Sequence, residues 1–241
     1  MKAGSFIFDG VTSESLNAVI QTRPVIETPK RKILLTGAYG QDGLTPYDEG
    51  AYENTPLSLI LYTGGPSAVE SREAVYDTFD HGTYKDLIIY SDDTKIYKVL
   101  MDNPPKFESR YYMGEGLSFE VGFTVKPYKF LRTSPLTTLT SAGNITNPTR
   151  YPSLPLITVT GSGDITLTIN GKPFSLKGVS GYIRLDSAIM EAYQDTGGIL
   201  VPQNTKVYTR DYPFLKPGVN TISWTGTVTK LEILPRWRTL T

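Results

Sequence analysis

The chain has 241 residues and a mass of 26.7 kDa, and its 24 Lys and Arg balance its 24 Asp and Glu. A hydrophobic share of 39% supports a packed core and excludes a disordered chain, and the neutral charge argues against a nucleic-acid binder. The lack of cysteine excludes disulfides and thiolate metal sites, and a single histidine, His81, excludes zinc sites built from several histidines.

Charge is distributed unevenly along the chain. Residues 1–130 hold 13 Lys and Arg against 18 Asp and Glu, a net charge of −5, whereas residues 131–241 hold 11 against 6, a net charge of +5. A stretch rich in Thr, Ser, Asn and Pro follows Leu131, as is common at domain edges. We therefore expect two domains, 1–130 and 131–241. No apolar run reaches the roughly 20 residues of a membrane-spanning helix, and the first residues do not resemble a secretory signal.

The first domain is expected to be mainly β. Phe6–Phe8 predicts a strand that ends in an Asp9-Gly10 turn. Prolines between residues 24 and 35 favour edge strands or an extended arm over a central strand, and a glycine-rich loop follows at 37–43. A buried strand is expected at 57–62.

One helix is expected in this domain. Ser67 and Glu70 have the spacing of a capping box, and apolar residues then recur at helical spacing through Phe79. Gly82 is placed for a left-handed cap after the helix. The segments 87–90 and 95–99 predict a β-hairpin, and 117–125 alternates as a last strand.

The second domain is expected to be a β-sandwich, because short alternating stretches are separated by frequent turn signals. A glycine-rich turn is predicted at 161–164, and Asn170-Gly171 predicts a tight hairpin turn. The propensities of 187–193 allow a helical turn, and a last hairpin is expected around Gly226. Strands are expected at 157–160, 165–169, 182–186, 222–224 and 231–233.

Few side chains suggest chemistry. His81 could act as a general base beside Asp80, but an exposed residue closing the helix is favoured. The carboxylates at 92–93 and 195 could hold calcium, but turn chemistry is favoured. Trp224 is expected in the core, and Trp237, between two arginines, at a surface or subunit contact. We therefore assign no catalytic, cofactor-binding or metal-binding residue, and expect a protein that binds or assembles and is not an enzyme.

The order of motifs along nearly the whole chain resembles the distal tail protein (Dit) family of long-tailed phages, the siphophages. The Pro217-Gly218-Val219-Asn220 block is the most specific element of this resemblance. The other matching motifs are 6–10, Pro29 with 40–43, the helix-and-hairpin block, 126–128, 147–149, Pro152, 155–157, 161–163, 169–171, 212–216 and 234–236. The chain resembles the compact form of the family, without inserted carbohydrate-binding modules.

The resemblance implies a structural protein of the virion tail tip, or baseplate, assembled in the cytoplasm of the bacterial host. Residues 1–130, with an extended arm or belt, would close six copies into a hexameric ring, and residues 131–241 would form a galectin-like β-sandwich that serves as a docking domain. The implied partners are the major tail (tube) protein, a tail-associated lysin or tail fibre protein, and receptor-binding or baseplate proteins. DNA would pass through the channel without specific binding, and no membrane is implied.

The resemblance also points to a loop as a subunit-interface candidate: Tyr39, Gly40, Gln41, Asp42 and Gly43. Trp237, because of its position between two arginines, is a further candidate. Family members usually carry Arg where this chain has Gln41, so a charged pair at that position is not available. The alternative is a carbohydrate-binding β-sandwich module that aids attachment to the host cell surface, since exposed aromatic rings can stack on sugars.

Overall fold

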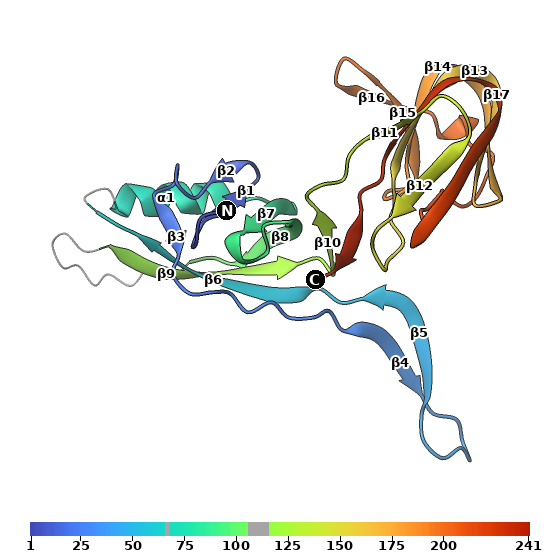
Figure 1. Cartoon of the computed structure of the whole chain (residues 1–241). Coiled ribbons are helices and arrows are strands. Elements are labelled where there is room, and N and C mark those ends of the chain that lie inside the picture. Colours follow the sequence, from blue (N-terminus) through green and yellow to red (C-terminus); the bar gives the residue numbers. More distant parts are fainter. Residues whose placement is uncertain (66–67, 106–115) are drawn as a thin grey trace. The chain divides into compact units, whose positions relative to one another are not determined.

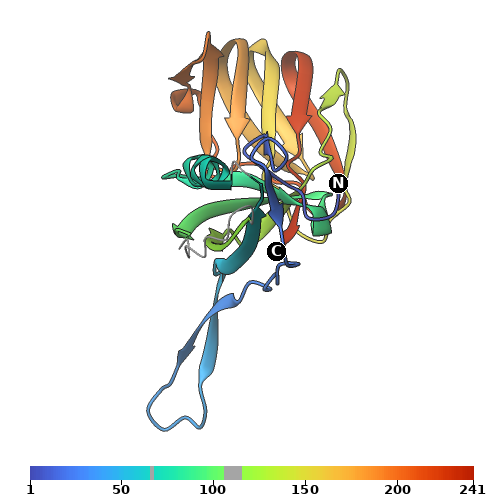
Figure 2. The same ribbon diagram turned by 90° about the vertical axis from the view of Figure 1, so that its left-hand side faces the viewer.

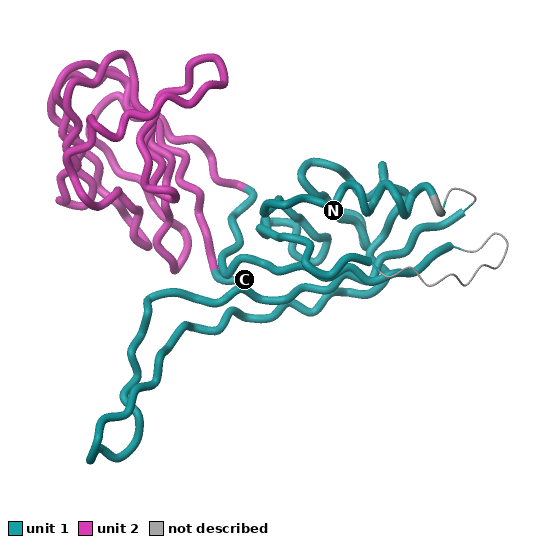
Figure 3. Tube along the Cα trace, turned by 180° about the vertical axis from the view of Figure 1, so that it is seen from behind, with its two compact units in different colours: residues 1–132, 240–241 teal, residues 133–239 magenta. Residues whose placement is uncertain are grey.

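The computed structural model describes residues 1–65, 68–105 and 116–241 (Figure 1). The chain divides into two compact units, which are coloured separately in Figure 3. Unit 1 contains residues 1–132 together with 240–241, and unit 2 contains residues 133–239. The chain therefore enters unit 2 once, leaves it once and ends in unit 1.

Unit 1 is built on an antiparallel sheet with the strand order β2-β1-β7-β8-β9-β6-β3, and β10 pairs with β8. A separate hairpin of β4 and β5 extends from this unit (Figure 1). In chain order its elements are β1 (Phe6–Phe8), β2 (Val11–Thr12), β3 (Ala18–Ile20), β4 (Arg31–Thr36), β5 (Thr45–Tyr52), β6 (Thr55–Thr63), α1 (Ala68–Phe79), β7 (Lys85–Ile89), a 3₁₀ turn (Tyr90–Asp92), β8 (Lys95–Asn103), β9 (Leu117–Val125) and β10 (Tyr128–Leu131).

An aromatic cluster fixes α1 to one face of this sheet. The ring of Phe79 lies 4.7 Å from that of Phe8 and 5.3 Å from that of Phe123, in edge-on geometries that aromatic pairs prefer. Val75, one helical turn earlier, is fully buried. In β6 alternate residues are buried, so Leu59 faces the core whereas Ile60 is exposed. The buried strand expected at 57–62 is therefore confirmed for one face.

Most local predictions for unit 1 are confirmed. Asp9 and Gly10 have positive φ values of 47° and 87°, as a tight β1–β2 turn requires, and β9 spans Leu117–Val125 as predicted. The helix is present, but Ser67 of the expected capping box lies outside the described residues. The left-handed cap at Gly82 is wrong: the helix ends at Phe79, and Gly82 does not have a positive φ.

Unit 2 is a sheet in the order β11-β17-β13-β14-β15-β16, with β12 also paired to β17. Figure 2 shows its long strands lying side by side. Its elements are β11 (Thr137–Leu139), β12 (Gly143–Asn147), β13 (Leu156–Ile169), β14 (Lys172–Asp186), β15 (Glu191–Thr196), β16 (Ile199–Pro202), a 3₁₀ turn (Asn204–Lys206) and β17 (Gly218–Leu234). The last strand, β18 (Arg238–Leu240), belongs to the sheet that contains β10.

Two turns expected in unit 2 are absent because glycines bend continuous strands instead. The predicted turn at 161–164 is wrong: β13 runs through it with a register shift against β14 between Gly163 and Ile165. Likewise β17 passes Gly226, at a φ of 94°, as one strand, so the last hairpin is also wrong. A Cβ on Gly161 would lie 2.1 Å from the carbonyl oxygen of Thr227. The glycines therefore allow two bulged strands to approach closely.

Asn170 and Gly171 form the predicted hairpin turn between β13 and β14, with φ values of 52° and 79°. The helical turn allowed at 187–193 is not formed, because Met190 has a φ of 54° and β15 starts at the next residue. Long bulged strands let the sheet of unit 2 curl so that its inner face is buried. The predicted fold class, mainly β with one helix and a β-sandwich, is confirmed.

Among the described residues, no helix is long and apolar enough to cross a membrane. The two residues that rejoin unit 1 are fixed by hydrogen bonds. The backbone N–H of Thr241 donates to the carbonyl of Pro127 at 3.0 Å, and the Thr241 hydroxyl donates to the carbonyl of Lys126 at 3.0 Å.

Candidate assembly surface

The β4–β5 hairpin, hereafter the arm (residues 31–52), is an exposed feature of unit 1. Its two antiparallel strands are exposed at every position except Tyr52, which is half-buried. The prolines at positions 24 and 29 precede it, and the segment 24–30 forms no strand. The expectation of an extended arm in this region is confirmed, and the arm has no core of its own.

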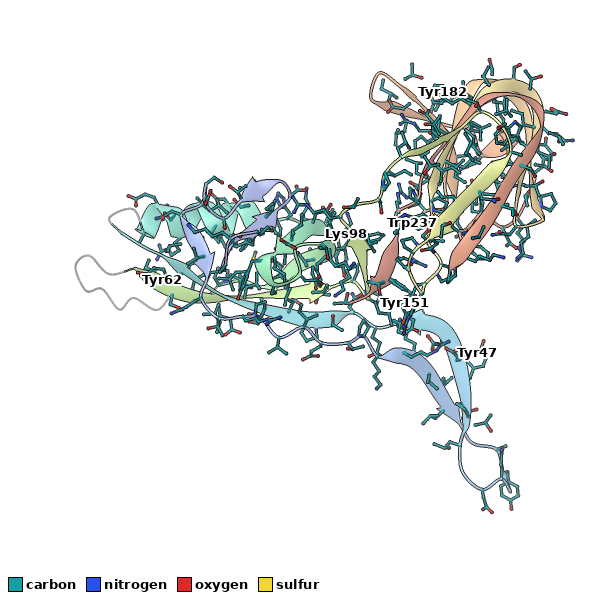
Figure 4. All side chains as sticks on the ribbon, viewed as in Figure 1. Tyr47, Tyr62, Lys98, Tyr151, Tyr182 and Trp237 are labelled. Atoms are coloured by element: carbon teal, nitrogen blue, oxygen red, sulfur yellow. The ribbon has the colours of Figure 1, made fainter. Side chains whose placement is uncertain are left out.

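The arm exposes large apolar side chains. Each of them has about half or more of its surface exposed: Ile33, Leu34, Leu35, Leu44 and Tyr47. Figure 4 shows Tyr47 on β5 with its side chain away from the sheet. A hairpin in isolation is marginally stable, and contiguous exposed apolar surface marks an interaction site. The run of three apolar residues at 33–35 was the sequence signal for this surface, since it lacks the alternation of a half-buried strand.

An ion pair braces the base of the arm across its two strands. The Nε of Arg31 lies 2.9 Å from both carboxylate oxygens of Asp48, and a second guanidinium nitrogen bonds the same carboxylate. This hydrogen bonding from Arg31 lowers the pKa of Asp48, and the carboxylate raises the pKa of Arg31. The guanidinium also lies 5.6 Å from the ring centre of Tyr52, whose ring packs edge-on against Tyr128 at 6.0 Å. The bracing contacts are therefore electrostatic and aromatic.

The loop singled out from the sequence lies at the tip of the arm. Tyr39 is fully exposed, and Gly40 and Gly43 have φ values of 77° and 80°, which glycine adopts without strain. The Gln41 side chain donates to the hydroxyl of Thr45 at 3.1 Å and so closes the loop. The structure thus places Tyr39, Gly40, Gln41, Asp42 and Gly43 together on an exposed tip, and their role in a subunit contact stays a prediction.

Trp237 is separated from this group. It is 5% exposed, and its backbone N–H donates to the Ser134 hydroxyl at 3.2 Å, so the expected surface position is wrong. The arginines beside it are engaged: Arg236 pairs with Asp186, and Arg238 donates to the carbonyl of Pro152. Their charges had suggested exposure, but both reach partners within unit 2. The other tryptophan, expected in the core, is only half-buried on β17.

The described ranges, which omit residues 66–67 and 106–115, contain no group of three or more His, Asp or Glu placed to hold a metal ion. His81 is exposed after α1 and stacks parallel to the Phe8 ring at 6.2 Å.

A buried cluster around Tyr97 contains side chains whose pKa values are shifted by structural contacts. Burial raises the pKa of Tyr97, whose hydroxyl donates to Asp92 at 2.7 Å, and Lys129 pairs with the same carboxylate at 2.8 Å. Because Tyr97 is fully buried, its hydroxyl ties Asp92 to the core, and this cluster serves to hold the fold together.

Unit 2 contains a cavity that the sequence did not suggest. Its volume is about 880 Å³, and it lies between the β13–β14 hairpin, the 187–190 turn and residues 209–216. Prolines and aromatic residues from separate stretches of sequence line it, including Pro173, Phe174, Tyr212 and Phe214. These stretches are brought together by the β14 pairing and by isolated bridges that join Ser153 to Leu215 and Leu176 to Val207. Because these contacts link distant parts of the sequence, no local sequence pattern predicts the cavity.

No protein-family model and no curated protein sequence matches this chain. Solved structures do match. The structure of the SPP1 Dit protein (gp 19.1), described as a paradigm of the hub adsorption apparatus in phages that infect Gram-positive bacteria, matches 99% of this chain and 100% of its own with a TM-score of 0.72. The chain has the Dit fold. The sequence identity is 14%, so the likeness shows the fold and not the activity.

Structures of the phage P2 baseplate in its activated conformation also have this fold. The one with Ca matches 90% of this chain and 90% of that chain, at 8% identity and a TM-score of 0.54. The one with Sr matches 93% of this chain and 91% of that chain, with the same identity and TM-score. The resemblance to the Dit family inferred from the sequence is therefore confirmed at the level of the fold.

Proposed function

We propose that this chain is a structural hub protein of a phage tail tip, in which six copies close into a ring. The ring joins the tail-tube protein to a tail fibre or tail-associated lysin, and unit 2 carries receptor-binding or baseplate proteins. The support is the Dit fold, which extends over 99% of the chain. The chain performs no catalytic step in this role.

The exposed arm is the structural feature that best supports the proposed ring. A closed ring requires a heterologous interface, in which each copy donates one surface and accepts another. The arm suits the donor role, because its apolar side chains gain burial only when a partner covers them. Its strands also expose main-chain groups that can pair with a neighbouring edge.

Unit 1 also offers an accepting surface on the outer face of the paired strands β3 and β6. Val19, Ile60 and Tyr62 are exposed there, although they are large apolar residues (Figure 4 labels Tyr62). A groove of about 280 Å³ opens beside Ile60 and is lined by Pro24, Val25 and Glu120 among others. An arm from one copy and this face of the next would form the repeated contact of the ring.

The net charge of residues 1–130 supports placing unit 1 around the DNA channel of the proposed ring. Residues 1–130 carry the net charge of −5, and an acidic wall repels DNA and so avoids the salt-dependent binding of a basic one. Assembly in the host cytoplasm agrees with the absence of cysteine.

The ring is tested by native mass spectrometry of the full chain, alone and mixed with its tail-tube protein. We expect a six-copy species in at least one of these conditions. Leu35→Asp places a charge on the apolar face of the arm without touching the core, so it should abolish that species while leaving the thermal midpoint unchanged.

The matched control is Leu200→Asp on β16 of unit 2. Leu200 is 58% exposed and Leu35 is 56% exposed, and both are strand residues. The control should assemble like the natural protein. Six-copy assembly that survives Leu35→Asp would exclude the arm as donor, and a chain that stays monomeric with its tail partner would overturn the hub role.

A further inference from the structure

The cavity of unit 2, hereafter the unit 2 cavity (the roughly 880 Å³ space beside Phe174, Tyr212 and Phe214), has the size of a ligand site, since such sites are typically about 300–1,000 Å³. The Phe174 and Tyr212 rings pack at 5.5 Å to form one wall. Phe214 and Met190, both exposed, add further hydrocarbon. Such a surface favours an apolar occupant.

Three polar side chains of the lining, those of Asn170, Thr209 and Tyr212, already have partners inside unit 2, whereas the buried Ser187 hydroxyl has none among the described residues. The Asn170 amide donates to Asn220 at 2.7 Å and accepts from the backbone of Thr221 at 3.2 Å. The Thr209 hydroxyl accepts from the backbone of Ser175 at 2.8 Å, and the Tyr212 hydroxyl donates to Asn204 at 3.4 Å. A sugar needs a partner for each of its hydroxyls, so the partnered amide and hydroxyls of this lining favour a mainly apolar group over a sugar.

Two lysines of the lining remain available to pair with a negatively charged ligand. Lys172 and Lys216 line the unit 2 cavity, both are exposed, and neither forms an ion pair with a carboxylate of the described chain. The Lys172 ammonium lies 5.4 Å from the centre of the Phe214 ring, so positive charge stands beside the apolar surface. Asp211 is the only acidic residue of the lining, and residues 131–241 carry a net charge of +5. The cavity thus matches a group that is apolar and negatively charged at once.

We propose that the unit 2 cavity binds an acidic segment of a partner tail protein, which inserts an aromatic side chain against Phe174, Tyr212 and Phe214. Carboxylates on either side of that aromatic residue pair with Lys172 and Lys216. This inference rests on the proposed function, because a docking role of unit 2 is what makes a protein segment the expected occupant. Buried aromatic anchors flanked by charge are typical of the residues that dominate binding energy in protein interfaces.

The probe is the peptide acetyl-Glu-Trp-Glu-amide, titrated into the full chain labelled with ¹³C in its methionine methyl groups. Met190 lines the cavity, whereas Met101 lies on β8 of unit 1 and serves as an internal control. We expect the Met190 methyl signal to shift to saturation and that of Met101 to stay in place. Replacing Trp by Ala, or both Glu by Lys, should weaken the apparent affinity about tenfold or more.

The chain offers a matched pair of variants. Lys172→Glu and Phe214→Ala each change the cavity, and both residues are exposed, so folding is expected to persist. Lys177→Glu and Tyr208→Ala change a similar cation–ring pair, with the ammonium 4.6 Å from the ring centre, outside the cavity. Each variant of the first pair should lower the affinity for the peptide about tenfold. Each variant of the second pair should leave that affinity within about twofold of the natural value.

Chitotriose and decanoate are titrated in parallel to distinguish other occupants. A Met190 shift that is stronger with chitotriose would make the cavity a sugar site, and one found only with decanoate would make it a site for lipid-like anions; either result overturns the proposal. So does a Met190 signal that no millimolar probe moves. Because these titrations do not depend on the ring, failure here with an intact six-copy species removes only the docking site, whereas loss of the ring alone removes the proposed hub role.

Discussion

The Asp186 carboxylate and the Arg236 guanidinium, 50 residues apart in sequence, meet in unit 2 through two parallel hydrogen bonds of 2.7 Å and 2.9 Å. The backbone N–H of Ala188 adds a third hydrogen bond at 3.0 Å. Burial by itself would raise the pKa of Asp186, but the bonds from Arg236 and Ala188 outweigh burial and hold this pKa below its usual 3.8. The pair ties the end of β14 to the chain that follows β17.

This geometry predicts a pH-dependent stability. Since the folded-state pKa of Asp186 is lowered, its contribution is complete above the ordinary pKa and is lost as the pH falls through the folded pKa. Asp186→Asn should lower the free energy of unfolding by about 3 kcal/mol at pH 7, and the difference should shrink as the pH falls below 3.8, the usual pKa of an Asp carboxyl. Urea unfolding of the natural protein and of Asp186→Asn, from pH 2.5 to pH 7, measures this difference in the free energy of unfolding.

The control for this prediction is Asp195→Asn. Asp195 pairs with Arg184 at 3.0 Å, but both side chains are about one-third exposed, so solvent screens the pair. Its loss should cost about 1 kcal/mol or less. An unchanged pH dependence in Asp186→Asn would contradict the role given to the Asp186 carboxylate.

Asn220 predicts a second large effect. Its buried amide donates to the carbonyls of Lys216 and Gly218, each at 2.9 Å, and accepts from Asn170 at 2.7 Å. Asn220→Ala removes these part-buried hydrogen bonds together and should cost about 3 kcal/mol in thermal or urea unfolding. Asn144→Ala, at an exposed position on β12, should stay within about 0.5 kcal/mol, and equal costs for the two would contradict the network.

The close approach of the β13 and β17 backbones at Gly161 and Thr227 predicts a third effect on stability. A Cβ on Gly161 would meet the Thr227 carbonyl oxygen at 2.1 Å, so the bulged strands must shift to admit it. Gly161→Ala should therefore destabilise by about 2–3 kcal/mol. Gly82 has open space and no positive φ, so Gly82→Ala should be neutral or slightly stabilising. A neutral Gly161→Ala in the same unfolding assay would show that the strands are not in close contact.

The ion pair of the arm predicts a local effect. Arg31→Ala removes the brace to Asp48 while leaving the buried core unchanged. Amide hydrogen exchange along β4 and β5 should become about threefold faster, and exchange in β6 should not change. Salt at 0.5 M should narrow the difference between the two proteins, because it screens exposed pairs. Lys32→Ala is the matched control, and faster exchange in β6 would show that the arm is not independent of the sheet.

Features set by neighbouring residues could be predicted from the sequence. The turns at Asp9-Gly10 and Asn170-Gly171 depend on two backbone angles each, and the alternation of 117–125 reports a strand directly. The arm was also foreseen, because proline disfavours a central strand. Its apolar surface could also be read from the sequence, because residues 33–35 are three apolar residues in a row and do not alternate with polar ones.

Features set by distant residues could not be predicted. The glycines at 161–163 look like a turn, and only the strand that crosses them, with Thr227 against Gly161, shows that they form a bulge. Trp237 is buried although charged residues flank it, because Arg236 finds Asp186. The unit 2 cavity is assembled from stretches that share no local pattern.

Both termini of unit 2 continue into unit 1, because Leu240 and Thr241 rejoin it and Thr241 bonds to Lys126 and Pro127. A truncation at residue 132, intended to isolate unit 1, would discard these two residues and leave two carbonyls without their donors. A short linker joining Arg132 to Leu240 would retain them. Conversely, a reporter fused after Thr241 would sense movements of unit 1, and one meant for unit 2 belongs in a surface turn such as 197–198.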